Sequence, residues 1–316
     1  MATAVQPHKR VRTQTGDQIA RLVTLIFAAS VVLIAVLIVY VLWTDSEASR
    51  QRLGWSFLWS SHWNPVTEQF GGLPFVYGTV LTSILALLIA VPLGLGSAIF
   101  LSELAPPRIS SALTFLIELL AAIPSVIYGL LAIFTLVPLM RIYIEPFLRS
   151  TLGFLPIFKG LAYGVGYLTA GVILAIMTLP FIISVSRESL LAVPREQREA
   201  SLAVGGTKWE TTWQVVVPYA RLGIMGSIFL GLARALGETM AVTMVIGNSA
   251  SIRASLFAPG HTIAAVIANE FAEATGDVYR GVLIELGLVL FCLTIVLNGL
   301  ARLMILATTQ KGSQRS

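Results

Sequence analysis

The sequence predicts an all-α polytopic membrane protein with six transmembrane helices. Of its 316 residues, 56% are hydrophobic and only 12% are charged, whereas soluble domains carry roughly 25% charged residues. The mean hydropathy is +0.84. Six stretches are apolar over about 20 residues, the length that an α-helix needs to cross the hydrocarbon core of a bilayer. We therefore expect lipid, and not water, to surround most of the chain.

The first apolar stretch, 19–43, is too long for a signal peptide, whose apolar region has about 7–15 residues, so we expect a retained helix. It follows a tail, 1–18, and precedes a tryptophan-rich loop, 44–73. The other five stretches form the core, 74–306, before a second tail, 307–316. They lie near 74–104, 110–140, 161–186, 222–248 and 281–306.

The distribution of Lys and Arg predicts the orientation of the chain. With the N-terminus inside, 13 of the 21 Lys and Arg residues fall in inner segments and 7 in outer ones. Cytoplasmic loops are enriched in these residues, so we expect both termini in the cytoplasm. The outer loop between Arg141 and Lys159 goes against this trend. The topology thereby explains the net charge of +5. The sequence has no stripe of basic residues interleaved with aromatic ones, so we do not expect nucleic acid as a partner.

The tryptophan-rich loop 44–73 contains Trp55, Trp59 and Trp63, which are spaced by four residues. In a helix these side chains would share one face. Such a stripe is typical of a helix that lies in the membrane interface. The alternative is a docking surface for an external partner.

The loop 187–221, expected in the cytoplasm, is the most polar part of the chain. A short helix carrying Glu199 and Ala200 is expected to end at Gly205 and Gly206, since glycine accepts the left-handed turn of a helix C-terminus. A second short helix should follow until Pro218 interrupts it. Two short helices joined at glycine predict a compact knob that a partner's surface can approach closely.

The spacing in this loop resembles the EAA loop of ABC importer permeases: Glu-Ala-Ala, three residues, Gly, nine residues, Ile-x-Leu-Pro. Here the corresponding letters are Glu-Ala-Ser at 199–201, Gly205, and Val-Val-Val-Pro at 215–218. The resemblance implies that the knob couples the permease to a separate ATPase. The alternative is an ordinary amphipathic hairpin. The chain has no phosphate-binding G-x-x-x-x-G-K-[ST] loop, so we expect ATP hydrolysis on a partner chain and no enzymatic activity in this one.

The fifth apolar stretch contains two charges, Arg234 and Glu238, at a spacing that places them on one helix face. An arginine in mid-membrane costs about 2.5–3.5 kcal/mol, and such residues usually face the bundle interior or a water-filled path. A guanidinium is well suited to contacting an oxyanion. The sequence therefore predicts a substrate path at these residues. Glu238 would either release Arg234 from their ion pair as the anion arrives or accept a hydrogen bond from the anion. The alternative is an ion pair that only neutralises itself.

The segment from Arg234 to Val242, Arg-Ala-Leu-Gly-Glu-Thr-Met-Ala-Val, closely resembles the PstC permeases of phosphate-specific ABC importers. Further similar segments lie at 87–93, 118–125, 268–273 and 285–288. The resemblance implies a type I ABC importer permease (MetI-like) core in the bacterial cytoplasmic (inner) membrane, with phosphate as cargo. It also implies a second permease subunit (PstA-like), two ATPase subunits (PstB-like) and an external phosphate-binding protein (PstS-like).

Three further polar residues of the apolar stretches are weaker candidates for the path: Glu118, Thr239 and Glu285. Glu118 and Glu285 are equally compatible with packing or with positions near the interface. No residues have the spacing of a metal site or of a nucleophile with its base, and no cofactor is expected. Another oxyanion such as molybdate or sulfate, an ATP-independent anion transporter or channel, and a phosphate-responsive signalling scaffold remain the alternatives.

Overall fold

The computed structural model describes residues 14–313, and its regular structure is helical, with no β-sheet among these residues. Six helical stretches are long and apolar enough to cross a membrane, which confirms the predicted fold class. They are Gly16–Asp45, Leu73–Leu104, Ser125–Leu152, Tyr167–Leu191, Lys208–Gly237 and Asp277–Leu300. The predicted tails 1–18 and 307–316 fall partly outside the described residues, and their described parts continue the first and last helices.

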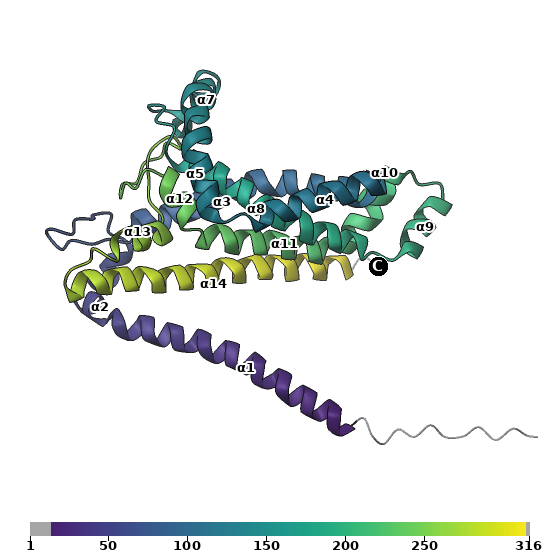
Figure 1. Cartoon of the computed structure of the whole chain (residues 1–316), viewed down its shortest axis with the longest axis horizontal. Helices are drawn as coiled ribbons and strands as arrows, with labels where there is room; N and C mark the ends of the chain where they lie inside the picture. The colour runs from purple at the N-terminus through teal and green to yellow at the C-terminus, as the bar shows by residue number, and fades with distance from the viewer. Residues whose placement is uncertain (1–13, 314–316) are drawn as a thin grey trace, which may run out of the picture.

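The long helices are α1 (Gln14–Asp45), α3 (Leu73–Ile99), α4 (Pro107–Ala122), α8 (Tyr167–Leu191), α11 (Val217–Gly237) and α14 (Asp277–Ser313). All except α1 run side by side along roughly one axis (Figure 1). Shorter helices gather at the two ends of this bundle (Figure 1). One end carries α9 (Arg195–Ala203) and α10 (Lys208–Thr211), and we call it the α9 end. The opposite end carries α2 (Glu47–Leu53) and α13 (Ile263–Glu270), and we call it the α2 end.

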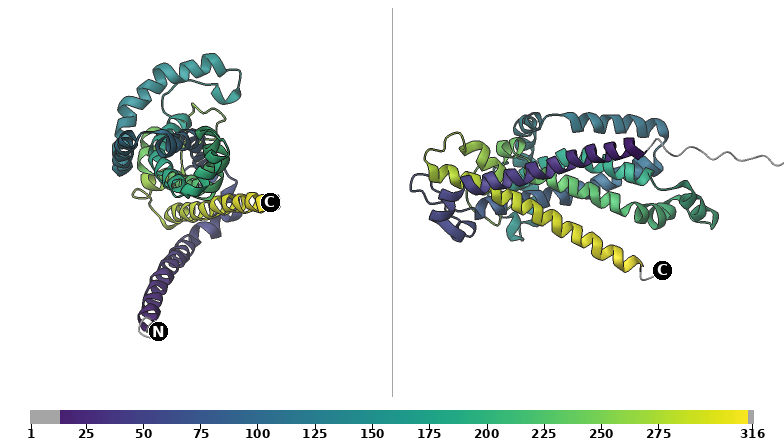
Figure 2. Two further views of the ribbon diagram at one scale, coloured as in Figure 1. Left: turned by 90° about the vertical axis from the view of Figure 1, so that its right-hand side faces the viewer. Right: turned by 90° about the horizontal axis from the view of Figure 1, so that it is seen from below.

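The centre of the bundle is the contact of α3 with α8 and of α8 with α11. Glycines make this close approach possible: a Cβ at Gly94 of α3 would lie 2.7 Å from the Cγ2 atom of Ile182 in α8. At Gly171 of α8 it would lie 2.7 Å from the Cβ atom of Leu85. Small residues at helix interfaces are the usual device for packing helices in lipid. In contrast, α1 buries none of its apolar residues within the chain and splays away from the bundle (Figures 1 and 2).

The third apolar stretch differs from its predicted limits, 110–140. The helix breaks at Ile123, which adopts an extended conformation (ψ 127°) before Pro124. Proline disfavours the helical conformation of the residue that precedes it. The structure therefore has α4 up to Ala122 and a second helical stretch, Ser125–Leu152, which includes α5 (Ser125–Leu131) and α7 (Glu145–Leu152). In Figure 1 this second stretch turns away from the bundle axis.

The expected aromatic stripe of three tryptophans does not form, because α2 ends at Leu53, before the first of them, and the 3-10 turn that follows ends at Leu58, before the second. Trp55 and Trp59 are exposed near α2. Trp63 lies beyond the helical residues, where it packs edge-on against Phe75 with ring centroids 4.6 Å apart. Its indole N–H donates to the Glu270 carboxylate at 3.1 Å. The first two rings thus remain available to lipid or a partner, whereas Trp63 fixes the loop to the bundle.

Candidate functional site

The polar loop at the α9 end has the helix end that the sequence predicts. Gly205 takes a positive φ of +93°. Its N–H donates to the Leu202 carbonyl at 3.0 Å, and the N–H of Gly206 donates to the Ser201 carbonyl at 3.1 Å. This pair of hydrogen bonds is the Schellman arrangement, which satisfies the last carbonyls of a helix. It ends the α9 helix, which carries Glu199 and Ala200 on exposed positions.

The second half of the loop begins with a capping box. The N–H of Glu210 donates to the Thr207 hydroxyl at 3.2 Å, and the Glu210 carboxylate accepts from the N–H of Thr207 at 2.8 Å. This reciprocal pair satisfies two free donors of a new helix. The sequence therefore starts α10 directly after the glycine turn.

The prediction that Pro218 interrupts this second helix is wrong. From Lys208 the helix continues through η6 (Thr212–Val216) into α11 without a break. Proline lacks an N–H and clashes with the carbonyl four residues earlier. The wide π-type turn of η6 relieves that clash, and π-turns are a usual way to place an irregularity inside a helix. One helix thus joins the loop to the bundle.

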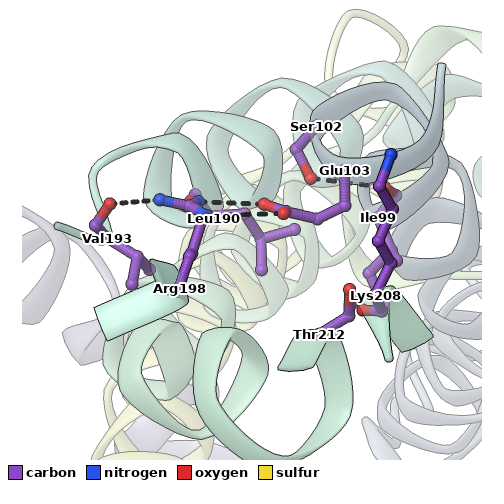
Figure 3. A network of polar contacts seen from close by, with 8 residues as sticks. All are labelled: Ile99, Ser102, Glu103, Leu190, Val193, Arg198, Lys208 and Thr212. Carbon is purple, nitrogen blue, oxygen red and sulfur yellow. Dashed lines mark hydrogen bonds and ion pairs between the residues drawn. The ribbon is translucent and has the colours of Figure 1, made fainter. Parts of the chain in front are cut away.

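Arg198 of α9 ties the loop to two helices of the bundle (Figure 3). Its Nη2 atom donates to Glu103, in the π-turn η2 (Phe100–Leu104) that ends α3, at 2.9 Å. The same atom donates to the carbonyl of Leu190 in α8 at 2.7 Å, and Nη1 donates to the carbonyl of Val193. Both charged side chains are at most 20% exposed. Charge-assisted hydrogen bonds are about twice as strong as neutral ones, so α9 is firmly fixed to the ends of α3 and α8.

The outer surface of this loop is apolar. Val204 is 87% exposed, and Trp209 and Trp213 form an exposed edge-on pair with ring centroids 5.6 Å apart. Large apolar side chains gathered on a polar loop mark a protein interaction surface. We call this surface, made by Leu202, Val204, Trp209 and Trp213, the knob surface.

Arg234 lies in the last turn of α11 and is partly buried. Its guanidinium carbon lies 4.4 Å from the centre of the Phe181 ring of α8, a cation–π contact. Its buried Nε atom has no hydrogen-bond partner among the described residues. An arginine held by an aromatic face, and not by a carboxylate, keeps its charge available to a ligand.

Glu238 does not share a helix face with Arg234, contrary to the prediction. The α11 helix ends at Gly237, and Glu238 is extended (ψ 125°). Its carboxylate accepts weakly, at 3.4 Å, from the N–H of Ala241 in α12 (Met240–Val245). Glycine lowers helix stability by about 1 kcal/mol, and Thr239 follows as the N-cap of α12. No ion pair joins Arg234 to Glu238 within residues 14–313, so the self-neutralising pair is absent there.

The two weaker carboxylate candidates have other neighbours than Arg234. Glu285 of α14 is buried and accepts a hydrogen bond from the Ser49 hydroxyl of α2 at 2.5 Å. Glu118 of α4 is exposed and lines a small crevice beside Arg187 of α8. The structure therefore gathers Arg234, Glu238 and Thr239 at the α11–α12 break, and places Glu118 beside Arg187 and Glu285 beside Ser49.

Comparison with known proteins identifies the family. A sequence model described as binding-protein-dependent transport system inner membrane component matches residues 90–308. The chain belongs to this family. Phosphate transport system permease protein PstC of Xylella fastidiosa (strain Temecula1) is 50% identical to this permease over 274 residues, 85% of this chain and 84% of the relative. The Pasteurella multocida protein of that name is 46% identical, covering 93% of both.

Solved structures agree with the fold alone. This permease superposes on a chain of the inward-facing MetNI methionine ABC transporter with a TM-score of 0.50 and 18% identity, over 76% of its own length and 98% of that chain. The permease fold is thus shared, as the sequence predicts for a MetI-like core. The chain is a multi-pass membrane protein of an ABC importer family.

Sequence reasoning missed two residues of the permease that support its predicted site residues. Glu103 lies at the end of an apolar stretch, 95 residues from its partner Arg198. Phe181 is one of 15 phenylalanines and looks like any other residue of an apolar helix. No spacing within one sequence identifies such long-range partners.

Proposed function

We propose that this chain is the permease subunit of an ATP-driven importer of inorganic phosphate. The observation that carries the proposal is the 50% identity, over 274 residues, to a protein named phosphate transport system permease. Assembly would require a second permease subunit, two ATPase subunits and an external phosphate-binding protein. The α9 end then faces the cytoplasm, in agreement with the excess of Lys and Arg in the inner segments.

The knob surface is the proposed contact with the ATPase. Glu199 and Ala200 on α9, the turn at Gly205 and Gly206, and the tryptophan pair form a rigid, exposed unit. Pro218 lies in the helix that leaves this unit. The segment 187–221 is therefore the proposed coupling loop within a permease core of 74–306.

The continuous helix from Lys208 to Gly237 supports a direct mechanical link to the path. It has 30 residues, which corresponds to about 45 Å at about 1.5 Å per residue. One end lies in the knob and the other carries Arg234 in its last turn. A helix transmits displacement along its axis without bending freely, so closure of the ATPases would move Arg234 relative to Phe181 on the neighbouring α8.

Arg234 is the proposed anion-contacting group. Its guanidinium has no carboxylate partner within residues 14–313 and stacks on Phe181. Glu238, released from the helix at the α11–α12 break, is the proposed group that accepts a hydrogen bond from phosphate. Phosphate near neutral pH retains a proton to donate, whereas sulfate has none, and this difference would favour phosphate.

The test is ATP-dependent uptake of labelled phosphate by the complete complex in proteoliposomes. We expect uptake by the wild type, loss of uptake with Arg234→Ala, and loss of coupling with Glu199→Ala, in variants first shown to assemble. Excess sulfate should compete poorly. If the wild type transports sulfate equally well, the cargo is a broader class of oxyanion. If it moves phosphate without ATP or partner subunits, the chain is an autonomous transporter and the proposal fails.

A further inference from the structure

The α3 and α8 helices point in the same direction. The chain leaves α3 at the α9 end, where Glu103 and the carbonyl of Leu190 in α8 both accept from Arg198. It enters α8 at the other end, where the rings of Tyr77 and Tyr167 lie 5.7 Å apart at the starts of α3 and α8. The two helices are thus parallel. The segment between them must cross the bundle an odd number of times.

That segment contains more helix than one crossing uses. The α4 helix has 16 residues and the stretch Ser125–Leu152 has 28. At about 1.5 Å per residue these amount to about 66 Å of helix, against a hydrocarbon core of about 30 Å. Figure 1 shows where the surplus goes: α4 runs along the bundle, whereas the helix from α5 to α7 runs across its axis. The view down the axis in Figure 2 shows the same helix curving around the bundle.

The side of this helix that faces the bundle is well packed. Met140 is fully buried with Leu168 of α8 and Phe257. Glu145 is also fully buried, and its carboxylate accepts a hydrogen bond from the N–H of Gly164 at 3.0 Å. The helix is therefore held in its transverse orientation by the chain itself.

The side that faces away is apolar and aromatic, with basic residues among the apolar ones. Large side chains there are at least 60% exposed, namely Phe134, Ile142, Tyr143 and Phe147, and so is Phe154 just beyond the helix end at Leu152. Arg141 and Arg149 are exposed on the same helix. Helices that lie in the membrane interface combine aromatic residues for the acyl boundary with Lys and Arg for the lipid phosphates.

We propose that residues 132–152 form an interfacial helix that binds the phospholipid surface at the α2 end of the bundle and does not cross the bilayer. The third crossing then consists of α4 and the two extended residues that follow it, Ile123 and Pro124. The aromatic side chains enter the boundary between headgroups and acyl chains, and Arg141 and Arg149 contact headgroup phosphates. This assignment also explains why these two arginines depart from the rule that basic residues stay inside.

The test measures the depth of spin labels in the membrane. The chain is purified with the subunits that accompany it and reconstituted in phosphatidylethanolamine and phosphatidylglycerol vesicles. The single cysteine, Cys292, is first replaced by Cys292→Ser. One label is then placed by Phe134→Cys, Tyr143→Cys or Phe154→Cys, and collision with oxygen and with a water-soluble nickel complex reports its depth.

An interfacial helix predicts the same shallow depth at all three sites. A spanning helix predicts a deep label at Tyr143 between two shallow ones, because Tyr143 lies about 13 Å along the helix from Phe134 at about 1.5 Å per residue and the hydrocarbon core is about 30 Å thick. The matched control is α1, where a label at Val31 should be deep and labels at Val23 and Tyr40 shallower. A deep label at Tyr143 between shallow ones at Phe134 and Phe154 would overturn the proposal. Protection of these labels from both reagents would also overturn it, because a protein subunit would then cover the helix. Neither outcome depends on phosphate transport.

Discussion

Arg198 and Glu103 join the loop 187–221 to the end of α3 through a hydrogen-bonded ion pair of 2.9 Å. Apart from Ser201, which shares a hydrogen bond with Thr211, the other residues of α9 are exposed. Without the Glu103 carboxylate, Arg198 still donates to the carbonyls of Leu190, in α8, and Val193, but it no longer contacts α3. The loop would then be attached to the end of α8 and would move with α8 alone.

The first prediction is that Glu103→Gln uncouples ATP hydrolysis from transport. We expect phosphate uptake per ATP hydrolysed to fall on the order of tenfold, the equivalent of about 1.4 kcal/mol, while hydrolysis continues. Uptake and phosphate release from ATP are measured on the same proteoliposomes. Arg195→Gln, on an exposed position of α9, is the matched control and should leave the ratio unchanged. An unchanged ratio in Glu103→Gln would show that the pair serves stability alone.

The second prediction concerns the glycine turn. In Gly205→Ala the added Cβ meets nothing within 4 Å, but φ is +93°, a conformation that costs an L-residue about 1–2 kcal/mol. We expect a lower midpoint of thermal unfolding in detergent and weaker ATPase binding. Gly226→Ala is the control, since it lies in α11 with open space around its Cβ. There alanine should stabilise the helix by up to about 1 kcal/mol. Equal shifts in the two variants would contradict the conformational explanation.

Sequence alone predicts the number of apolar stretches and the glycine end of α9, because composition and local turn chemistry determine both. It fails where the outcome depends on neighbouring helices. Pro218 was expected to end a helix, but the π-turn η6 absorbs it. Glu238 was expected on the face of Arg234, but the helix ends at Gly237. Phe181 replaces the expected carboxylate partner, and only the packing of α8 on α11 reveals it.

The third prediction concerns pH. His261 is buried at the α2 end against the Phe75 ring, and burial lowers its pKa to about 4. In the unfolded chain its pKa is about 6.5. Between these values the unfolded state binds one proton more, so the free energy of unfolding decreases as the pH falls from about 6.5 to about 4. The loss amounts to about 3 kcal/mol at most, at 1.36 kcal/mol per pKa unit.

This pH dependence is measurable as the midpoint of thermal unfolding in detergent between pH 7 and pH 4.5. We expect His261→Gln to flatten the decline, since glutamine takes up no proton. His62→Gln replaces an exposed histidine and should leave the decline as in the wild type. A decline that persists in full in His261→Gln would assign the effect to other groups.

The last prediction separates positioning of Arg234 from its charge. Phe181→Leu keeps the charge but removes the aromatic face 4.4 Å from the guanidinium carbon. A desolvated cation–π contact is worth about 1–2 kcal/mol, so KM for phosphate delivered by the binding protein should rise roughly 5- to 30-fold. The maximal rate should change little, and Phe181→Trp should retain a low KM. Phe291→Leu, in α14, is the control for the loss of a partly buried ring. If Phe181→Leu lowers the maximal rate and leaves KM unchanged, the ring contributes to the movement of α11 against α8. It then does not position Arg234 for binding the anion.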